Sequence, residues 1–182
     1  MAHTSLWVCV LVVLAAAVSD VATRRIPNTV TLGGLAVGLA IHAAIGAVDA
    51  GLTGALRGLG FALGGAVACG IIPFIAWRRG EMGGGDVKLF GAIGALLGPA
   101  AGFDVQALTF VLSLVVLFPY RLVRHGAVRV ALANVRIGLG NLLRRRDARA
   151  PYLGGPKLPP VILAPTIGVA FVLALLQRGA LR

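Results

Sequence analysis

Six long apolar stretches alternate along this chain with shorter polar or glycine-rich connections. They cover residues 5–18, 31–48, 56–77, 87–101, 105–120 and 160–176. A helix of about 20 mostly apolar residues is long enough to cross the hydrocarbon core of a bilayer. The sequence lacks the alternating strands, about ten residues long, that build a membrane β-barrel. The pattern predicts an all-α, polytopic integral membrane protein with about six transmembrane helices, the fourth and fifth of them short.

The composition supports the same fold class. The chain has 182 residues, a mean hydropathy of +0.93 and only 13% charged residues, which is too apolar for an ordinary soluble domain. Its 26 glycines suit helices that pack closely in lipid, because small residues let two backbones approach. We therefore expect residues 1–182 to form a single transmembrane domain.

The distribution of basic residues predicts the orientation. There are 17 Lys and Arg residues against 6 Asp and Glu residues, a formal net charge of +11. The basic residues gather between the first and second, the third and fourth, and above all the fifth and sixth stretches. Because positive charge is retained on the cytoplasmic side, these connections are predicted to be cytoplasmic and both termini extracytoplasmic. Charge scattered beside membrane spans favours anionic lipid as a partner over nucleic acid.

The connection 121–159 is predicted to be a basic cytoplasmic loop. Within it, apolar residues recur at helical spacing and arginines fall to one side of them: Val128, Leu132, Val135, Leu139 and Leu142, with Arg129 and Arg136. This spacing is typical of a helix that lies in the membrane interface. A solvated basic connector is the alternative, and the sequence leaves both open.

The cysteines and histidines carry no signal for a metal site. Cys9 and Cys69 are isolated in apolar stretches without a CxxC pair, so we expect both to be small buried apolar residues. The three histidines are scattered and have no metal-ligand spacing. The sequence therefore predicts neither a metal nor a disulfide.

Two of the six acidic residues are candidates for chemistry. The other four have ordinary explanations as solvated or locally neutralised charges: Asp49, Glu81, Asp104 and Asp147. Asp20 ends the first apolar stretch and Asp86 precedes the fourth, so both are predicted to lie at the cytoplasmic membrane face. Carboxylates in a membrane segment are costly and are functional candidates for that reason. An aspartyl protease needs such a pair, one ionised to accept a proton from water and one protonated to polarise the scissile carbonyl.

Helix dipoles predict which aspartate is which. Asp86 would begin a helix, where an anion is favoured, and Asp20 would end one, where it is disfavoured. Asp86 is therefore predicted to be the more ionised member and Asp20 the protonated one. Purely structural alternatives are a helix N-cap for Asp86 and an ion pair between Asp20 and Arg24.

Two motifs give this pair a context. The run Gly83-Gly84-Gly85-Asp86 fits a Gly-x-Gly-Asp pattern, and Asp20 is followed by Arg25-Ile26-Pro27-Asn28. A proline-rich segment, residues 157–165, leads into the last apolar stretch. In these motifs, their order and the predicted spans, the chain resembles the type IV prepilin leader peptidases, a family of membrane aspartyl proteases.

The resemblance implies an aspartic endopeptidase of the bacterial cytoplasmic (inner) membrane. It would cleave the short basic leader of type IV or Flp-like prepilins or pseudopilins at the cytoplasmic face, with Asp20 and Asp86 as catalytic residues and no metal or organic cofactor. Gly83, Gly84, Gly85 and Lys88 are expected to contact the substrate, the glycines by letting its backbone approach. Pro27 and Asn28 are expected to shape the entry to the second span.

One departure from the larger members concerns a second activity. Those members add a cytoplasmic domain with paired CxxC motifs that is linked to methylation of the new pilin N-terminus. The two lone cysteines of this chain do not match it, so N-methyltransferase activity is not expected. The chain resembles the short, peptidase-only members of Flp or tight-adherence pilus systems.

Two other classes of function stay open on the sequence. A small transporter or channel could use the two aspartates as a proton relay. A non-catalytic assembly factor of a pilus or secretion machine could keep the fold without cleaving. Cleavage of a co-expressed prepilin separates the three, and the sequence does not define the oligomeric state.

Overall fold

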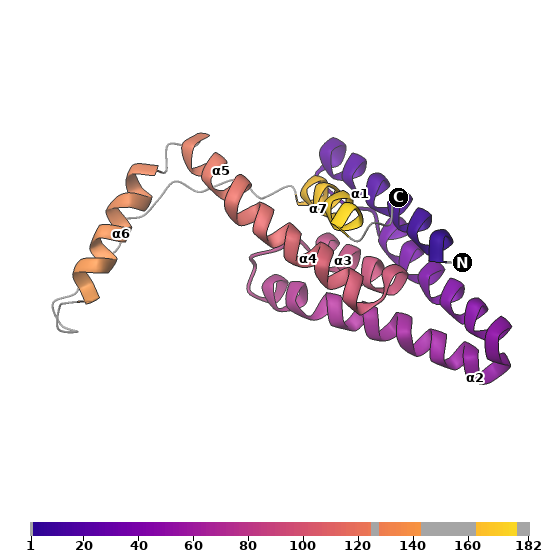
Figure 1. Ribbon diagram of the computed structural model, residues 1–182. Coiled ribbons are helices and arrows are strands. Elements are labelled where there is room, and N and C mark those ends of the chain that lie inside the picture. Colours follow the sequence, from indigo (N-terminus) through magenta and orange to yellow (C-terminus); the bar gives the residue numbers. More distant parts are fainter. Residues whose placement is uncertain (1, 125–127, 143–162, 178–182) are drawn as a thin grey trace. The chain divides into compact units, whose positions relative to one another are not determined.

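The computed structural model describes residues 2–124, 128–142 and 163–177, and these residues contain helices and no strand. The helices are α1 (Ala2–Thr23), α2 (Asn28–Arg78), α3 (Gly84–Leu97), α4 (Pro99–Leu112), the π-helical η1 (Ser113–Leu117), α5 (Phe118–Arg124), α6 (Val128–Leu142) and α7 (Ala164–Gln177) (Figure 1). The all-α prediction is confirmed. The chain divides into two compact units, residues 1–111 with 161–182, and residues 112–160.

The long α2 is a hairpin of two antiparallel arms. Ala50 and Gly51 leave the helical region, and Gly51 has a φ of 59°, a conformation that glycine adopts without strain. A Cβ on Gly46 would collide with the carbonyl of Gly54, so the two arms touch backbone to backbone near the turn. Figure 1 shows the arms meeting at a sharp bend. The arms hold the stretches predicted as the second and third spans.

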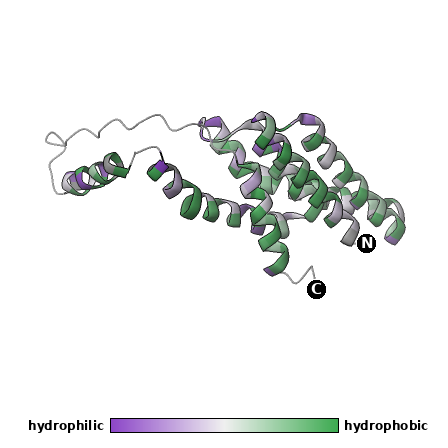
Figure 2. Cartoon of the chain, turned by 90° about the horizontal axis from the view of Figure 1, so that it is seen from above, coloured by the Kyte–Doolittle hydropathy of each residue, from purple (hydrophilic) through white to green (hydrophobic). Residues whose placement is uncertain are grey.

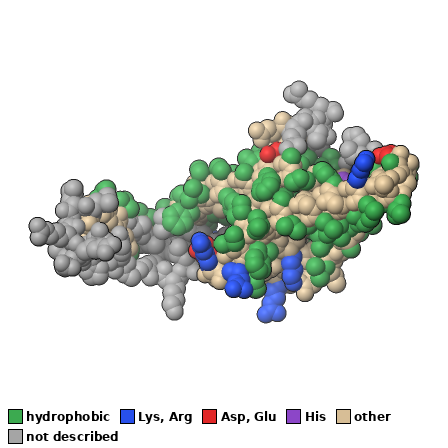
Figure 3. Space-filling view, turned by 90° about the horizontal axis from the view of Figure 1, so that it is seen from below, with side chains coloured by type: hydrophobic (Ala, Val, Ile, Leu, Met, Phe, Trp, Pro, Cys, Tyr) green, Lys and Arg blue, Asp and Glu red, His purple; other side chains and the backbone are tan. Residues whose placement is uncertain are grey.

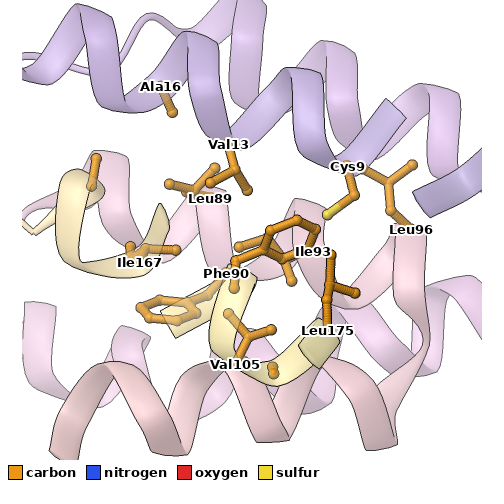
Figure 4. Close-up of a cluster of buried hydrophobic side chains, with 13 residues drawn as sticks. Cys9, Val13, Ala16, Leu89, Phe90, Ile93, Leu96, Val105, Ile167 and Leu175 are labelled. Carbon is orange, nitrogen blue, oxygen red and sulfur yellow. The ribbon is translucent and has the colours of Figure 1, made fainter. Parts of the chain in front are cut away.

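The short α3 lies at the centre of the larger unit. Its Leu89, Phe90, Ile93 and Leu96 are completely buried, and Figure 4 shows them converging with apolar side chains of α1 and α7. Its 14 residues give a length of about 21 Å, below the roughly 30 Å of a hydrocarbon core. The segment predicted as a short fourth span is therefore a helix enclosed mainly by other helices.

Apolar side chains also cover the outside of this unit. Trp7, Leu11, Leu14 and Val18 recur along one face of α1 and are each more than half exposed. Figure 2 shows hydrophobic residues along most of the ribbon, and Figure 3 shows hydrophobic side chains spread over much of the described surface, with several Lys and Arg side chains gathered at one edge. Exposed apolar faces of this extent require a lipid-like environment.

Within the described residues, three helices are long and apolar enough to cross a membrane: Thr4–Thr23, Asn28–Arg78 and Pro99–Tyr120. The second of them is the α2 hairpin, and α7 is a shorter apolar helix. The lengths and composition agree with a membrane protein. The count of six spans and the extracytoplasmic position of both termini stay predictions.

The smaller unit contains the helix that the spacing of apolar residues indicated. α6 spans 128–142, and its Leu132, Val135 and Leu139 are each at least 60% exposed. Arg136 lies on the exposed side as well. The basic cluster at 144–149 and the proline-rich segment up to residue 162 fall outside the described residues.

Candidate active site

The two aspartates singled out by the sequence lie in contacting helices of the larger unit. Asp20 is in the last turn of α1 and Asp86 in the first turn of α3, and these helices pack on each other. Each side chain is only 7% exposed. The charge of Asp20 is among the causes that shift the pKa of Asp86, so the two carboxyls interact. The fold therefore joins two buried acids that stand 66 positions apart in sequence.

Asp86 occupies the third position of its helix, with Gly83 at the N-cap. Gly83 has extended backbone angles (φ −73°, ψ 143°), and its carbonyl accepts the Asp86 N–H at 3.2 Å. A backbone hydrogen bond from Gly83 also reaches the Asp86 carboxyl, as in a capping box, where the third residue bonds back to the cap. The alternative of Asp86 as the N-cap itself is therefore wrong.

The environment of Asp86 favours its protonated form. Burial, and after it the charge of Asp20, raise the pKa of Asp86 to about 7, although the hydrogen bond from Gly83 acts in the opposite direction. This overturns the prediction that the helix dipole keeps Asp86 ionised. The dipole argument considered only the position in the helix, whereas desolvation by the surrounding helices is the larger effect.

Asp20 is held by the start of a distant helix. Its Oδ2 accepts a hydrogen bond from the backbone N–H of Ala164, the first residue of α7, at 3.2 Å. Arg24 contacts Asp20 through its backbone, donating its N–H to the Asp20 carbonyl at 2.8 Å. The ion pair considered for Asp20 and Arg24 is therefore not what holds the carboxylate.

The turn after α1 is closed by two hydroxyl groups. Ser19 and Thr23 both donate to the carbonyl of Arg25, at 3.0 and 3.1 Å. Arg24 has a φ of 54°, a left-handed conformation that costs a non-glycine residue about 1–2 kcal/mol and here ends the helix. These contacts fix the path of the chain from Asp20 into the Ile-Pro-Asn segment.

The Ile-Pro-Asn segment contacts the glycine run and the start of α3. Pro27 is the N-cap of α2, and its carbonyl accepts the N–H groups of Val30 and Thr31. Asn28 Oδ1 accepts a hydrogen bond from Lys88 Nζ at 2.8 Å. A Cβ on Gly85 would come within 3.1 Å of the Ile26 Cβ, so the two backbones approach closely there. Lys88 therefore contacts Asn28, and it is not among the causes of the Asp86 pKa shift.

Each glycine before Asp86 faces a different neighbour. A Cβ on Gly83 would lie 3.0 Å from Asp86 Oδ2, and one on Gly84 would lie 3.3 Å from Trp77 Nε1. Sequence reasoning read this run as room for a substrate and did not anticipate Trp77. It also missed Ala164, which acts through a backbone N–H and so leaves no side-chain signal.

The described residues contain no cluster that suggests a metal. No three His, Cys, Asp or Glu side chains gather within residues 2–124, 128–142 and 163–177. Cys9 and Cys69 are both buried and free, which confirms the prediction that they are buried apolar residues. The chemistry that the site supports is acid–base chemistry by the two interacting carboxyls of Asp20 and Asp86.

Comparison with known proteins gives a family. The model of the type IV leader peptidase family matches residues 7–119, which include both aspartates, the Ile-Pro-Asn segment and the glycine run. No curated protein and no solved structure matches the chain. The match extends over more than half of the sequence, and the chain belongs to the type IV leader peptidase family.

Proposed function

We propose that the chain is an aspartic endopeptidase that removes the basic leader of Flp-like prepilins or pseudopilins, with Asp20 and Asp86 as its catalytic residues. The observation that carries the proposal is the interaction of two almost fully buried carboxyls, one beside each motif. Membership of the type IV leader peptidase family supports a leader peptide as the substrate.

The environments of the two carboxyls suggest their roles. We assign Asp86 as the acid, because burial and the charge of Asp20 raise its pKa to about 7, and Asp20 as the base. Asp20 accepts a proton from water as the water oxygen attacks the scissile carbonyl carbon. Asp86 gives its proton to the carbonyl oxygen as the tetrahedral intermediate forms. When the C–N bond breaks, the nitrogen takes a proton from Asp20, the new carboxyl forms, and Asp86 regains its proton.

The substrate would approach from the basic side of the bundle. Arg24 and Arg25 follow Asp20, while Arg78 and Arg79 precede the glycine run, so positive-inside orientation would place both aspartates at the cytoplasmic face. This fits a leader peptide that extends into the cytoplasm from an apolar helix in the bilayer. Lys88 is exposed, and its hydrogen bond to Asn28 holds it near the site as a candidate substrate contact, together with the backbone of the glycine run.

Co-expression with a small prepilin that has a glycine before its cleavage site tests the proposal. Leader removal appears as a mobility shift, and mass spectrometry of the product is expected to show an unmethylated N-terminus. Asp20→Asn and Asp86→Asn should each abolish the shift. Asp49→Asn, an exposed carboxylate beside the α2 turn, is the matched control and should leave it intact.

Two outcomes would contradict the peptidase assignment. Processing that survives in both the Asp20→Asn and the Asp86→Asn variants would remove the aspartates from the chemistry. Proton or ion flux in proteoliposomes that depends on the same aspartates, without any cleavage, would favour a transporter instead.

A further inference from the structure

The N-terminus of α7 lies directly against the Asp20 carboxylate. Ala164 is completely buried, and its N–H points to Asp20 Oδ2. Leu163, also buried, precedes the helix, and its carbonyl accepts the Ile167 N–H at 2.9 Å, as the N-cap of a helix does. The contact therefore comes from the first helical residue, at a defined position of a regular helix start.

The first N–H groups of a helix have no partner within the helix, and together they carry a partial positive charge. In α7 the second residue is Pro165, which has no N–H and stiffens the first turn. The Ala164 N–H thus donates to Asp20 without breaking any helical hydrogen bond. A carboxylate oxygen at this position is stabilised by both the hydrogen bond and the helix dipole.

Packing holds α7 in this position. Ile167, Ala170 and Phe171 are buried on the side of the helix that faces the core, and α7 packs against α1. Val13 of α1 belongs to the same apolar cluster, and it lies 3.8 Å from where a Cβ on Gly168 would stand. The distance between the Ala164 N–H and Asp20 is therefore set by a packed helix pair.

We propose that the start of α7 is a positioning element of the aspartyl pair: the Ala164 N–H fixes the Asp20 carboxylate and makes Asp20 the base, which leaves the shared proton on Asp86. The inference rests on the proposed peptidase function and deepens it. It assigns to the last helix, 144 positions from Asp20 in sequence, control over which carboxyl accepts the proton.

Ala164→Pro removes the donor alone. Proline is well tolerated at the first position of a helix, where its missing N–H breaks no helical bond. Ala164→Gly is the matched control, because it keeps the N–H. If the proline variant does not fold, replacement of the residue-164 amide by an ester through an incorporated hydroxy acid removes the same N–H with less change.

The first readout is the pH dependence of kcat/KM for leader cleavage. Loss of the donor should move the acidic limb, where the base becomes protonated, to higher pH by about one pH unit, while the basic limb stays in place. The glycine control should follow the wild type. A lower rate with an unmoved acidic limb would indicate a merely structural role and would overturn the inference.

The second readout does not depend on activity. Infrared spectra near pH 6 should show a protonated carboxyl that disappears in Asp86→Asn. When Asp86→Asn is combined with loss of the Ala164 donor, part of this signal should persist. It would then come from Asp20, whose carboxylate has lost the hydrogen bond that stabilises its charge. A spectrum that is the same with and without the donor would contradict this inference even if the chain is a peptidase. A wild-type protein that never cleaves a prepilin would contradict the peptidase assignment, and this inference with it.

Discussion

Replacing Asp86 by Asn should change how the stability of the protein depends on pH. Burial and the charge of Asp20 raise the pKa of Asp86 to about 7 in the folded chain, from 3.8 as its ordinary value. Between these two pH values the folded protein binds a proton that the unfolded chain has released. Folding stability therefore falls as the pH rises through this window and is constant above it.

The size of the effect follows from the two pKa values. A rise from 3.8 to about 7 corresponds to a loss of at most about 4 kcal/mol of unfolding free energy between pH 4 and pH 8. Asn has nearly the same shape as Asp but does not ionise, so Asp86→Asn lacks this loss. We expect the variant and the wild type to have similar stability near pH 4, and the variant to be more stable at pH 8.

Unfolding in detergent micelles, followed from pH 4 to pH 8, measures this difference. Other groups titrate in the same range, so the informative quantity is the free energy of the variant minus that of the wild type at each pH. Glu81→Gln, an exposed carboxylate in the loop before the same helix, controls for the loss of one negative charge. Parallel curves for wild type and Asp86→Asn, or a wild type that gains relative stability with rising pH, would refute the reasoning.

Three further perturbations test other contacts. Asn28→Ala and Lys88→Met should each cost about 1 kcal/mol of stability, and a double-mutant cycle should show a coupling of about 0.5–1 kcal/mol, since both remove the same exposed hydrogen bond. Gly65→Ala should destabilise by about 1–3 kcal/mol, because its Cβ would meet the backbone of α3, whereas Gly64→Ala, with open space around it, should change unfolding little. Hydrogen exchange of α6 in nanodiscs should be slower with anionic than with zwitterionic lipid, and Leu132→Asp should abolish that difference if the exposed apolar face lies on the membrane.

Hydropathy predicted the helices well where the apolar runs are long. Both arms of α2 were expected, because two long stretches are separated by the polar turn around Asp49. The boundary between α3 and α4 was not, since the apolar stretches at 87–101 and 105–120 place it near residues 102–104, whereas the two helices are separated by Gly98 alone, which has a φ of 80°. Pro99 then begins the next helix at once, a position that proline favours. A single glycine with a positive φ therefore connects the two helices, and a hydropathy pattern cannot reveal such a short connection.

The sequence also predicted one part of the candidate site and missed another. Sorting the acids by their place along the apolar stretches identified Asp20 and Asp86 as a pair, and the fold gives them interacting carboxyls. Their order of ionisation was assigned from helix dipoles, which depend on local position. Burial by other helices and the donor from Ala164 are tertiary effects, and the dipole of each aspartate's own helix carries no information about them.

The glycine run also has a different meaning once its neighbours are known. A Cβ on Gly85 would press on Ile26, in the turn that follows α1, and would push the start of α3 away from that turn. Because Asp86 is the next residue in the chain, such a displacement would also move its carboxyl relative to Asp20. A small residue at this position is therefore explained by the distance between the two acids, independently of any need for a substrate to approach. Gly85→Ala should accordingly weaken the effect of the Asp20 charge on the pKa of Asp86, even in the absence of substrate.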